Sequence, residues 1–250
     1  MQMLQACIGW KQELDTAGAI GMNLHGKSVM RLTVLASFAM TLTTIRLVDD
    51  SRLVAAALLP LWFLMLRPLQ RAEWILFFFV GAFFVGQNYA VLSAGGFAFR
   101  QKDIFLMPYY EPLLWGYWFL NISRFAAEPA GQINLHWRAF LGVVATAAMF
   151  TMFGANSDRL LLGTLASSTL LLVLFHEPAD VRQGLYALVL GFAIEYFGVS
   201  QGFWSYPKSD MLGMPYWFAT MWFSIGILGR RFVQPLAQWL ARQATAAQGN

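Results

Sequence analysis

The stretch GMPYWFATMW, residues 213–222, has a close counterpart upstream in LMPYYEPLLW, residues 106–115. Each stretch contains Met-Pro-Tyr, and each has a tryptophan seven residues after the proline. Aligning Pro108 with Pro215 sets an offset of 107 residues, which also aligns Trp115 with Trp222. The repeated motif predicts a fold that contains one unit twice.

The same offset aligns further residues without any gap. The aligned pairs are Tyr89 and Tyr196, Ser93 and Ser200, Gly95 and Gly202, Asp103 and Asp210, Arg124 and Arg231, Arg31 and Arg138, and Arg52 and Arg159. Identities in register over so long a span predict a tandem repeat with units at 27–127 and 134–234.

The composition indicates a membrane protein, because 58% of the 250 residues are hydrophobic and 12% are charged. A membrane-spanning helix needs about 20 apolar residues. Apolar runs lie at 30–47, 52–68, 74–95, 107–123, 138–154, 159–175, 183–201 and 214–229. The runs at 52–68 and 159–175 are the weakest, which leaves six or seven crossings as alternatives. We expect an all-α, polytopic transmembrane bundle of about eight spans, built as a parallel tandem repeat of four-helix units.

Basic residues predict the orientation of these spans. With eight crossings, one side of the membrane holds Lys11, Lys27, Arg31, Arg67, Arg71, Arg124, Arg138, Arg182, Arg230, Arg231 and Arg242, and the other holds Arg46, Arg52, Arg100, Lys102, Arg159 and Lys208. The positive-inside rule then predicts cytoplasmic termini in a bacterial inner membrane, with a cytoplasmic segment at 1–26 and an amphipathic cytoplasmic tail at 235–250. The basic residues flank apolar spans and form no contiguous patch, so we expect no nucleic acid partner.

The N-terminal segment has no continuous apolar core, and it is therefore not expected to be a signal peptide. Cys7 is the only cysteine, which excludes an intrachain disulfide. Residues 4–7 faintly resemble a lipoprotein box, but the apolar stretch that should precede such a box is missing.

The loops before the two Met-Pro-Tyr motifs carry residues that fit helix ends. Gly95 and Gly202 are suited to the end of the third helix of each unit, where positive φ is common. Pro108 and Pro215 are expected to start the fourth helix. Asp103 and Asp210 are expected to accept hydrogen bonds from free backbone amides near that start.

Aromatic residues near these loops allow two interpretations. Tyr109, Tyr216, Trp204 and Tyr206 fit an interfacial aromatic belt. Trp115 and Trp222 fit it less well, because seven residues of helix place them about 10 Å deeper. We therefore expect two facing indoles that form the wall of a cavity, and all six aromatic residues are candidate substrate-binding groups.

Two glutamates are the candidate catalytic residues. Glu195 lies inside an apolar span and Glu111 lies near the start of another, and carboxyls in such positions usually face a bundle interior or a wet cavity. Desolvation is expected to keep one or both of them protonated near neutral pH, with Glu195 the more buried and the more nearly neutral of the two. The aligned positions hold Asn88 and Phe218, so the site is asymmetric, and Asn88, Gln87 and Gln201 are candidate polar contacts. The alternative is a packing clamp, in which Glu195 merely bonds Asn88 or Gln87.

The segment EYFGVSQGFWSYP, residues 195–207, together with residues 213–222, resembles membrane carotenoid hydratases of the bacterioruberin type and duplicated membrane lycopene cyclases. These enzymes protonate a terminal isoprenoid double bond. The resemblance rests on the Gly202, Trp204 and Tyr206 loop, and it aligns Glu111 with the second glutamate of the cyclase pair. Tyr110 stands where the cyclases have the first glutamate, and the second unit has Trp217 and Phe218 at both positions.

We expect no cofactor and no metal site, because the three histidines, His25, His136 and His176, are scattered and no phosphate loop or nucleotide fingerprint is present. Two functions remain open. One is acid-catalysed hydration or cyclisation of a polyene lipid, and the other is a transporter or binding module for a lipid or small molecule. An assembly or scaffolding role is a third. The expected partners are membrane lipids and a hydrophobic small molecule, and the sequence leaves the oligomeric state unknown.

Overall fold

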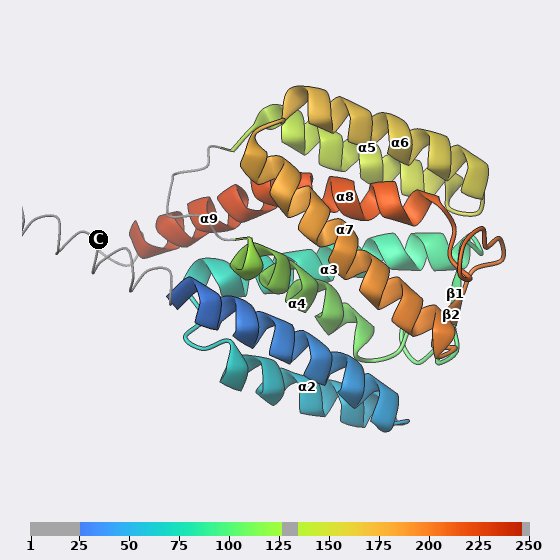
Figure 1. The fold of residues 1–250 in the computed structure, drawn as a ribbon, viewed down its shortest axis with the longest axis horizontal. Helices are drawn as coiled ribbons and strands as arrows, with labels where there is room; N and C mark the ends of the chain where they lie inside the picture. The colour runs from blue at the N-terminus through green and yellow to red at the C-terminus, as the bar shows by residue number, and fades with distance from the viewer. Residues whose placement is uncertain (1–25, 127–134, 247–250) are drawn as a thin grey trace, which may run out of the picture.

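A computed structural model describes residues 26–126 and 135–246. The first unit contains a helix at Gly26–Leu47, then α2 (Ser51–Met65), α3 (Arg71–Ser93), β1 (Ala98–Phe99) and α4 (Glu111–Phe125). The second contains α5 (Trp137–Phe153), α6 (Ser157–Leu174), α7 (Pro178–Ser200), β2 (Trp204–Ser205) and α8 (Trp217–Leu228), which continues through a π-helical turn, η1 (Gly229–Val233), into α9 (Gln234–Ala246). Figure 1 shows a helical bundle from which α9 projects at the end opposite β1 and β2.

The all-α fold predicted from the apolar runs is confirmed, since a helix lies over each of the eight runs. Four described helices are long and apolar enough to cross a membrane: Gly26–Leu47, α3, α6 and α7. The helices α2 and α5 are apolar but shorter. The chain is therefore an integral membrane protein, and the number of its crossings stays a prediction.

The fourth helix of each unit forms the centre of the bundle. Every residue from Leu114 to Ile122 of α4 is buried, and so is every residue from Ser224 through Val233 of α8 and η1. A helix that is buried on all sides belongs to the interior of a large bundle. The helix α3 packs on α4, while α7 and α6 pack on α8, so each central helix packs mainly on helices of its own unit.

The two motif loops, residues 94–110 and 201–216, lie at one end of the bundle and pair with each other through β1 and β2 (Figure 1). The antiparallel register places Ala98 opposite Ser205 and Phe99 opposite Trp204. This short ribbon joins the two units, and nothing in the alternation of the sequence predicted it.

Glycine ends the third helix of each unit, as predicted. Gly95 has a φ of 80° and Gly202 a φ of 68°, conformations that a side chain disfavours. After each glycine the next backbone amide bonds the carbonyl five residues back, 3.0 Å for Gly96 to Val91 and 2.8 Å for Phe203 to Gly198. This Schellman geometry turns the chain sharply back over the helix that it leaves.

The expected role of the two prolines is corrected by the structure, because α4 begins at Glu111 and α8 at Trp217, two or three residues after Pro108 and Pro215. The proline carbonyls accept hydrogen bonds from the amides of Glu111 and Phe218, so each proline forms the turn that precedes the helix.

The two aspartates of the motif loops differ in their contacts. Asp210 accepts a 3.1 Å hydrogen bond from the amide of Tyr216, as expected. Asp103 instead accepts from the hydroxyl of Ser51, 2.5 Å away, and so fixes the first motif loop to the start of α2. The cap predicted for Asp103 is therefore wrong.

Ion pairs tie the end of each fourth helix to the start of the third helix of its unit. Arg124 bonds Glu73 at 2.6 Å, and Arg231 bonds Asp180, with 2.7 Å between Nε and Oδ1. Asp180 is fully buried and also accepts a 3.0 Å hydrogen bond from Arg230. Buried charges in a membrane protein need such partners.

Several features recur at the predicted offset of 107 residues. The bounds of α3 and α7 differ by this number at both ends, and so do the bridges Ile104–Met107 and Met211–Met214. These correspondences support a duplicated unit, and superposition of 27–127 on 134–234 stays a prediction. The segment at 1–26 with Cys7 lies outside the described residues apart from Gly26, as do residues 247–250 of the tail. The rest of the tail is α9, which packs on α3.

Candidate functional site

A central cavity of about 630 Å³ lies between the two units. Its walls come from α3, α4, α5, α7 and α8, with further side chains from the helix Gly26–Leu47, both motif loops and η1. Most of the lining is aliphatic or aromatic, and the carboxyls of Glu111 and Glu195 are among its few polar groups. The two candidate catalytic residues therefore line one site.

Glu195 of α7 is 8% exposed and receives hydrogen bonds from three aromatic side chains. Its Oε2 accepts from the hydroxyl of Tyr206 at 2.7 Å and from Nε1 of Trp204 at 2.9 Å. Its Oε1 receives a longer 3.4 Å contact from Nε1 of Trp222. Two of these donors are on the second motif loop and the third is on α8, so the site depends on how that loop folds.

The sharp turn at Gly202 brings Trp204 and Tyr206 back over the end of α7. A side chain at Gly198 would overlap the Trp204 indole, so the missing Cβ lets this ring pack directly against α7 near Glu195. Burial, with Glu195 close by, raises the pKa of Tyr206 well above its ordinary value. The hydroxyl therefore keeps its proton near neutral pH.

Glu111, the first residue of α4, is 7% exposed and accepts a 3.1 Å hydrogen bond from Nδ2 of Asn88 on α3. The two carboxyls are thus buried to the same extent, and the expectation that Glu195 is the more buried is wrong. The proposed packing clamp is also not what the structure shows, because Asn88 bonds Glu111 and Glu195 bonds the aromatic residues of its own unit. Gln87 lines the cavity near this pair.

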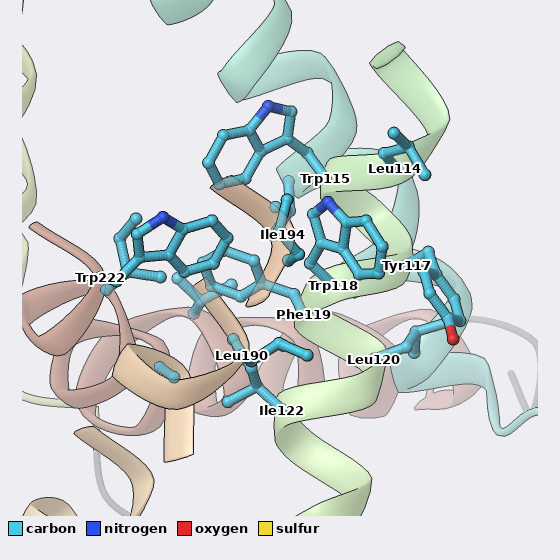
Figure 2. Close-up of a cluster of buried hydrophobic side chains, with 14 of the residues drawn as sticks. Leu114, Trp115, Tyr117, Trp118, Phe119, Leu120, Ile122, Leu190, Ile194 and Trp222 are labelled. Carbon is cyan, nitrogen blue, oxygen red and sulfur yellow. The ribbon is translucent and has the colours of Figure 1, made fainter. Parts of the chain in front are cut away.

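Stacked aromatic rings form one wall of the cavity. The rings of Phe84 and Trp115 are parallel with centroids 3.8 Å apart, and Trp115 stacks on Trp222 at 5.4 Å and 14°. A side chain at Gly191, which aligns with Phe84, would overlap the Trp222 indole. Figure 2 shows the rings of Trp115, Trp118 and Trp222 gathered from α4 and α8 near Ile194.

Trp115 leaves one polar atom without a partner. Its Nε1 is buried near the carboxyl of Glu111 but makes no hydrogen bond of normal geometry within the described part of the chain. An unpaired buried N–H costs free energy, so this atom is available to an acceptor on a bound molecule.

Three predicted contacts lie away from the cavity. Tyr109 bonds Arg52 through its hydroxyl at 3.5 Å, Tyr216 is 51% exposed, and Gln201 is exposed after the end of α7. Sequence reasoning missed most of the aromatic residues that line the cavity, among them Phe84, Trp118, Phe119 and Trp217. Trp118 and Phe119 follow Trp115 by three and four residues, a helical spacing that places all three on one face and could have identified them.

The cavity extends to the outer surface between α3 and α5. Phe79 of α3 is 40% exposed, and Phe140 and Val144 of α5 are 48% and 47% exposed, yet all three line the cavity. In a membrane protein these outer faces contact lipid. The cavity therefore has a lateral opening, defined here by Phe79, Phe140, Val144 and Ala148, through which it meets the bilayer.

Within the described residues, no group of three or more His, Cys, Asp or Glu side chains is arranged to hold a metal ion. His25 lies outside the described residues, and His136 and His176 do not line the cavity.

Comparison with known proteins supports the fold alone. No protein-family model matches the sequence, and no curated protein matches it significantly. The chain is structurally similar to the mycobacterial Insig homolog MvINS from Mycobacterium vanbaalenii, with a TM-score of 0.59 and 20% identity over 70% of this chain and 98% of MvINS. A second structure, of a cross-linked trimer of an MvINS variant, gives the same values. The chain therefore shares the polytopic helical fold of this Insig homolog.

Proposed function

We propose that the protein binds a polyene or isoprenoid lipid in the central cavity and acts on a terminal double bond by acid catalysis. The observation that carries the proposal is the combination of an apolar cavity open to lipid with two carboxyls inside it. An apolar site with a few placed polar groups is typical of a small-molecule pocket.

The shape of the cavity favours a long apolar ligand. Its lining on α8 and η1 runs from Trp217 to Val233, which corresponds to about 24 Å of helix. The lateral opening gives an apolar molecule access from the bilayer without passage through water. Glu111, Glu195 and the unpaired Nε1 of Trp115 then receive the end of the chain that reaches the motif loops.

The chemistry needs a carboxylic acid and a surface that stabilises positive charge. Both stronger donors converge on Oε2 of Glu195, which leaves Oε1 as the oxygen to carry the acid proton. Transfer of that proton to a C=C bond forms a C–H bond and a carbocation, and the indole faces of Trp115 and Trp222 stabilise the cation. Addition of water, or attack by a second double bond in the chain, then releases a proton that returns to the carboxylate.

A lipid-binding module is the second candidate, and the full set of donors around Glu195 favours it. A carboxyl that accepts three hydrogen bonds can serve as a fixed structural acceptor without transferring a proton. A transport route has less support, because Leu228, Phe232 and Val233 line the end of the cavity away from the motif loops and offer no polar path there.

The proposal places the site in a bacterial inner membrane, with both described ends of the chain cytoplasmic and the motif loops on the other side. The arginine distribution supports this orientation. The aqueous side near the carboxyls would then be the non-cytoplasmic one.

Lipid extraction and mass spectrometry of the purified protein test the proposal. We expect a co-purified unsaturated lipid, and we expect wild-type protein to add water to it or cyclise it when it is supplied in liposomes. Glu195→Gln keeps the shape of the side chain but removes the transferable proton, so the lipid should bind while conversion stops. Tyr216→Phe, which alters an exposed tyrosine of the same loop, serves as the control. Retained conversion in Glu195→Gln would overturn the catalytic assignment, and absence of any bound lipid would overturn the proposal itself.

A further inference from the structure

A second pocket of about 330 Å³, here called the loop-side pocket, lies on the other side of Glu195's hydrogen-bond donors. It is lined by Ala98, Phe99, Arg100, Val199, Gly202, Trp204, Ser205, Tyr206, Ser209 and Gly213. Phe99, Trp204 and Tyr206 line both this pocket and the central cavity. These three side chains therefore form a single layer, here called the separating layer, between the loop-side pocket and the central cavity.

The loop-side pocket differs from the central cavity in polarity. Arg100, Ser205 and Ser209 are exposed there, and they lie in loops beyond the ends of α3 and α7. Such loops lie outside the hydrocarbon region, since backbone groups that are not paired in a helix need water. One face of the separating layer therefore meets water, and the other meets the apolar cavity.

Of the three side chains that bond Glu195, only one can pass a proton. The indole nitrogens of Trp204 and Trp222 are donors only, whereas the Tyr206 hydroxyl can donate and accept at the same time. Tyr206 also belongs to the separating layer. Its hydroxyl lies 2.7 Å from Oε2 of Glu195, so Tyr206 is the residue that can connect the carboxyl with the loop-side pocket.

We propose that the loop-side pocket holds water and that Glu195 exchanges its proton with this water through the hydroxyl of Tyr206. A hydronium ion in the pocket gives a proton to Tyr206 Oη while the hydroxyl proton passes to Oε2 of Glu195, so water and neutral tyrosine remain. Rotation of the carboxyl group about its Cγ–Cδ bond then brings this proton to the position that Oε1 occupies in the structure, where the proposed reaction uses it. The raised pKa of Tyr206 agrees with a relay that is neutral before and after each transfer. The relay would supply protons to Glu195, the acid of the proposed reaction. Its purpose therefore rests on the proposed function, whereas its geometry rests on the two pockets.

Infrared spectroscopy measures the exchange without any substrate. The C=O stretch of a protonated carboxyl that disappears in Glu195→Gln belongs to Glu195, and its shift after transfer into D₂O gives the exchange rate. In Tyr206→Phe we expect this rate to fall by about 100-fold, the lower range for a positioned proton-transfer group. The phenylalanine ring keeps the edge contact with Trp217 and the contact with Phe97, so the fold should persist.

Tyr216→Phe is the matched control and should exchange at the wild-type rate. An unchanged rate in Tyr206→Phe would overturn the relay, as would the absence of any Glu195-dependent band. The water-filled pocket has its own test, since Ser209→Cys in a Cys7→Ser background should react with a charged, membrane-impermeant thiol reagent, and failure to react would contradict it. If exchange is slower in Tyr206→Phe but the protein binds no lipid, the relay is supported and the proposed function is contradicted.

Discussion

The indole rings of Trp115 and Trp222, 107 residues apart in sequence, stack with centroids 5.4 Å apart at the centre of the bundle. Each ring comes from the fourth helix of its unit, at the same distance from the Met-Pro-Tyr motif. The repeated motif thus supplies two equivalent rings to one cavity wall, while the residues that support the rings differ between the units.

That difference gives a prediction about Gly191, where a Cβ would overlap the Trp222 ring. Gly191→Ala should displace Trp222 from the stack and destabilise the protein by about 1–3 kcal/mol, the usual cost of overpacking. Near-UV circular dichroism should show loss of the coupled indole signal, and SDS titration should show the lower stability. Gly86→Ala is the control, because a Cβ there meets no atom within 4 Å. Equal behaviour of the two variants would contradict the packing described for Trp222.

The ion pairs at the other end of the bundle should contribute unequally to stability. Asp180 is fully buried and bonds two arginines, while the side chain of Glu73 is 18% exposed and bonds one. We expect Asp180→Asn to lower the free energy of unfolding by about 3–5 kcal/mol, because it removes the buried carboxylate that bonds both guanidinium groups and leaves them the half-exposed Glu177 as an acidic partner. Glu73→Gln should lower it less.

Asp158→Asn is the comparison for these two variants. Asp158 pairs with Lys208 on the surface, where both side chains are more than half exposed, so its loss should change stability little. SDS titration of the three variants measures the order of their stabilities. A larger loss of stability in Asp158→Asn than in Asp180→Asn would show that burial does not determine how much these ion pairs contribute to stability.

The lateral opening should control how fast lipid enters the cavity. Ala148 is exposed on α5 and lines the cavity, whereas Ala145, exposed on the same helix, does not. Ala148→Trp should fill the opening and slow exchange of a fluorescent polyene lipid from vesicles, and Ala145→Trp should leave the rate unchanged. Stopped-flow quenching of tryptophan fluorescence follows this exchange. If both variants exchange at the wild-type rate, lipid enters by another route.

The orientation can be tested at Lys208, an exposed residue of the second motif loop. In a Cys7→Ser background, Lys208→Cys should react with an impermeant maleimide from the non-cytoplasmic side of cells, and Arg242→Cys on α9 should react only after the membrane is opened. The opposite pattern would show that the termini are not cytoplasmic. The arginine count is then the wrong guide to topology for this chain.

Hydropathy located the helices well because a run of apolar residues is a local property. Each of the eight predicted runs overlaps a helix. The first residue of the run lies within five residues of the first residue of the helix, and the last residue of the run lies within three residues of the last residue of the helix. The positions of Gly95 and Gly202 at helix ends were also predictable, because a helix often ends with a residue at positive φ and glycine is the residue that adopts this φ most readily.

The partners of the carboxyls were not predictable, because they depend on how a loop folds over a helix end. Glu195 bonds Trp204 and Tyr206, nine and eleven residues ahead, only because the chain reverses at Gly202. Asp103 and Asp210 illustrate the same limit. They align in sequence, yet one bonds the hydroxyl of Ser51 and the other a backbone amide, since the neighbouring helices differ.

The β1–β2 ribbon also bears on how the protein can move. It fastens the two units together at the loop end, and Trp204 belongs both to β2 and to the group of side chains that bond Glu195. At the opposite end α9 packs on α3, so the two units are joined at both ends of the bundle. A bulky guest molecule would therefore have to widen the bundle between these two joints, and the ribbon would keep the hydrogen-bond donors of Glu195 in place.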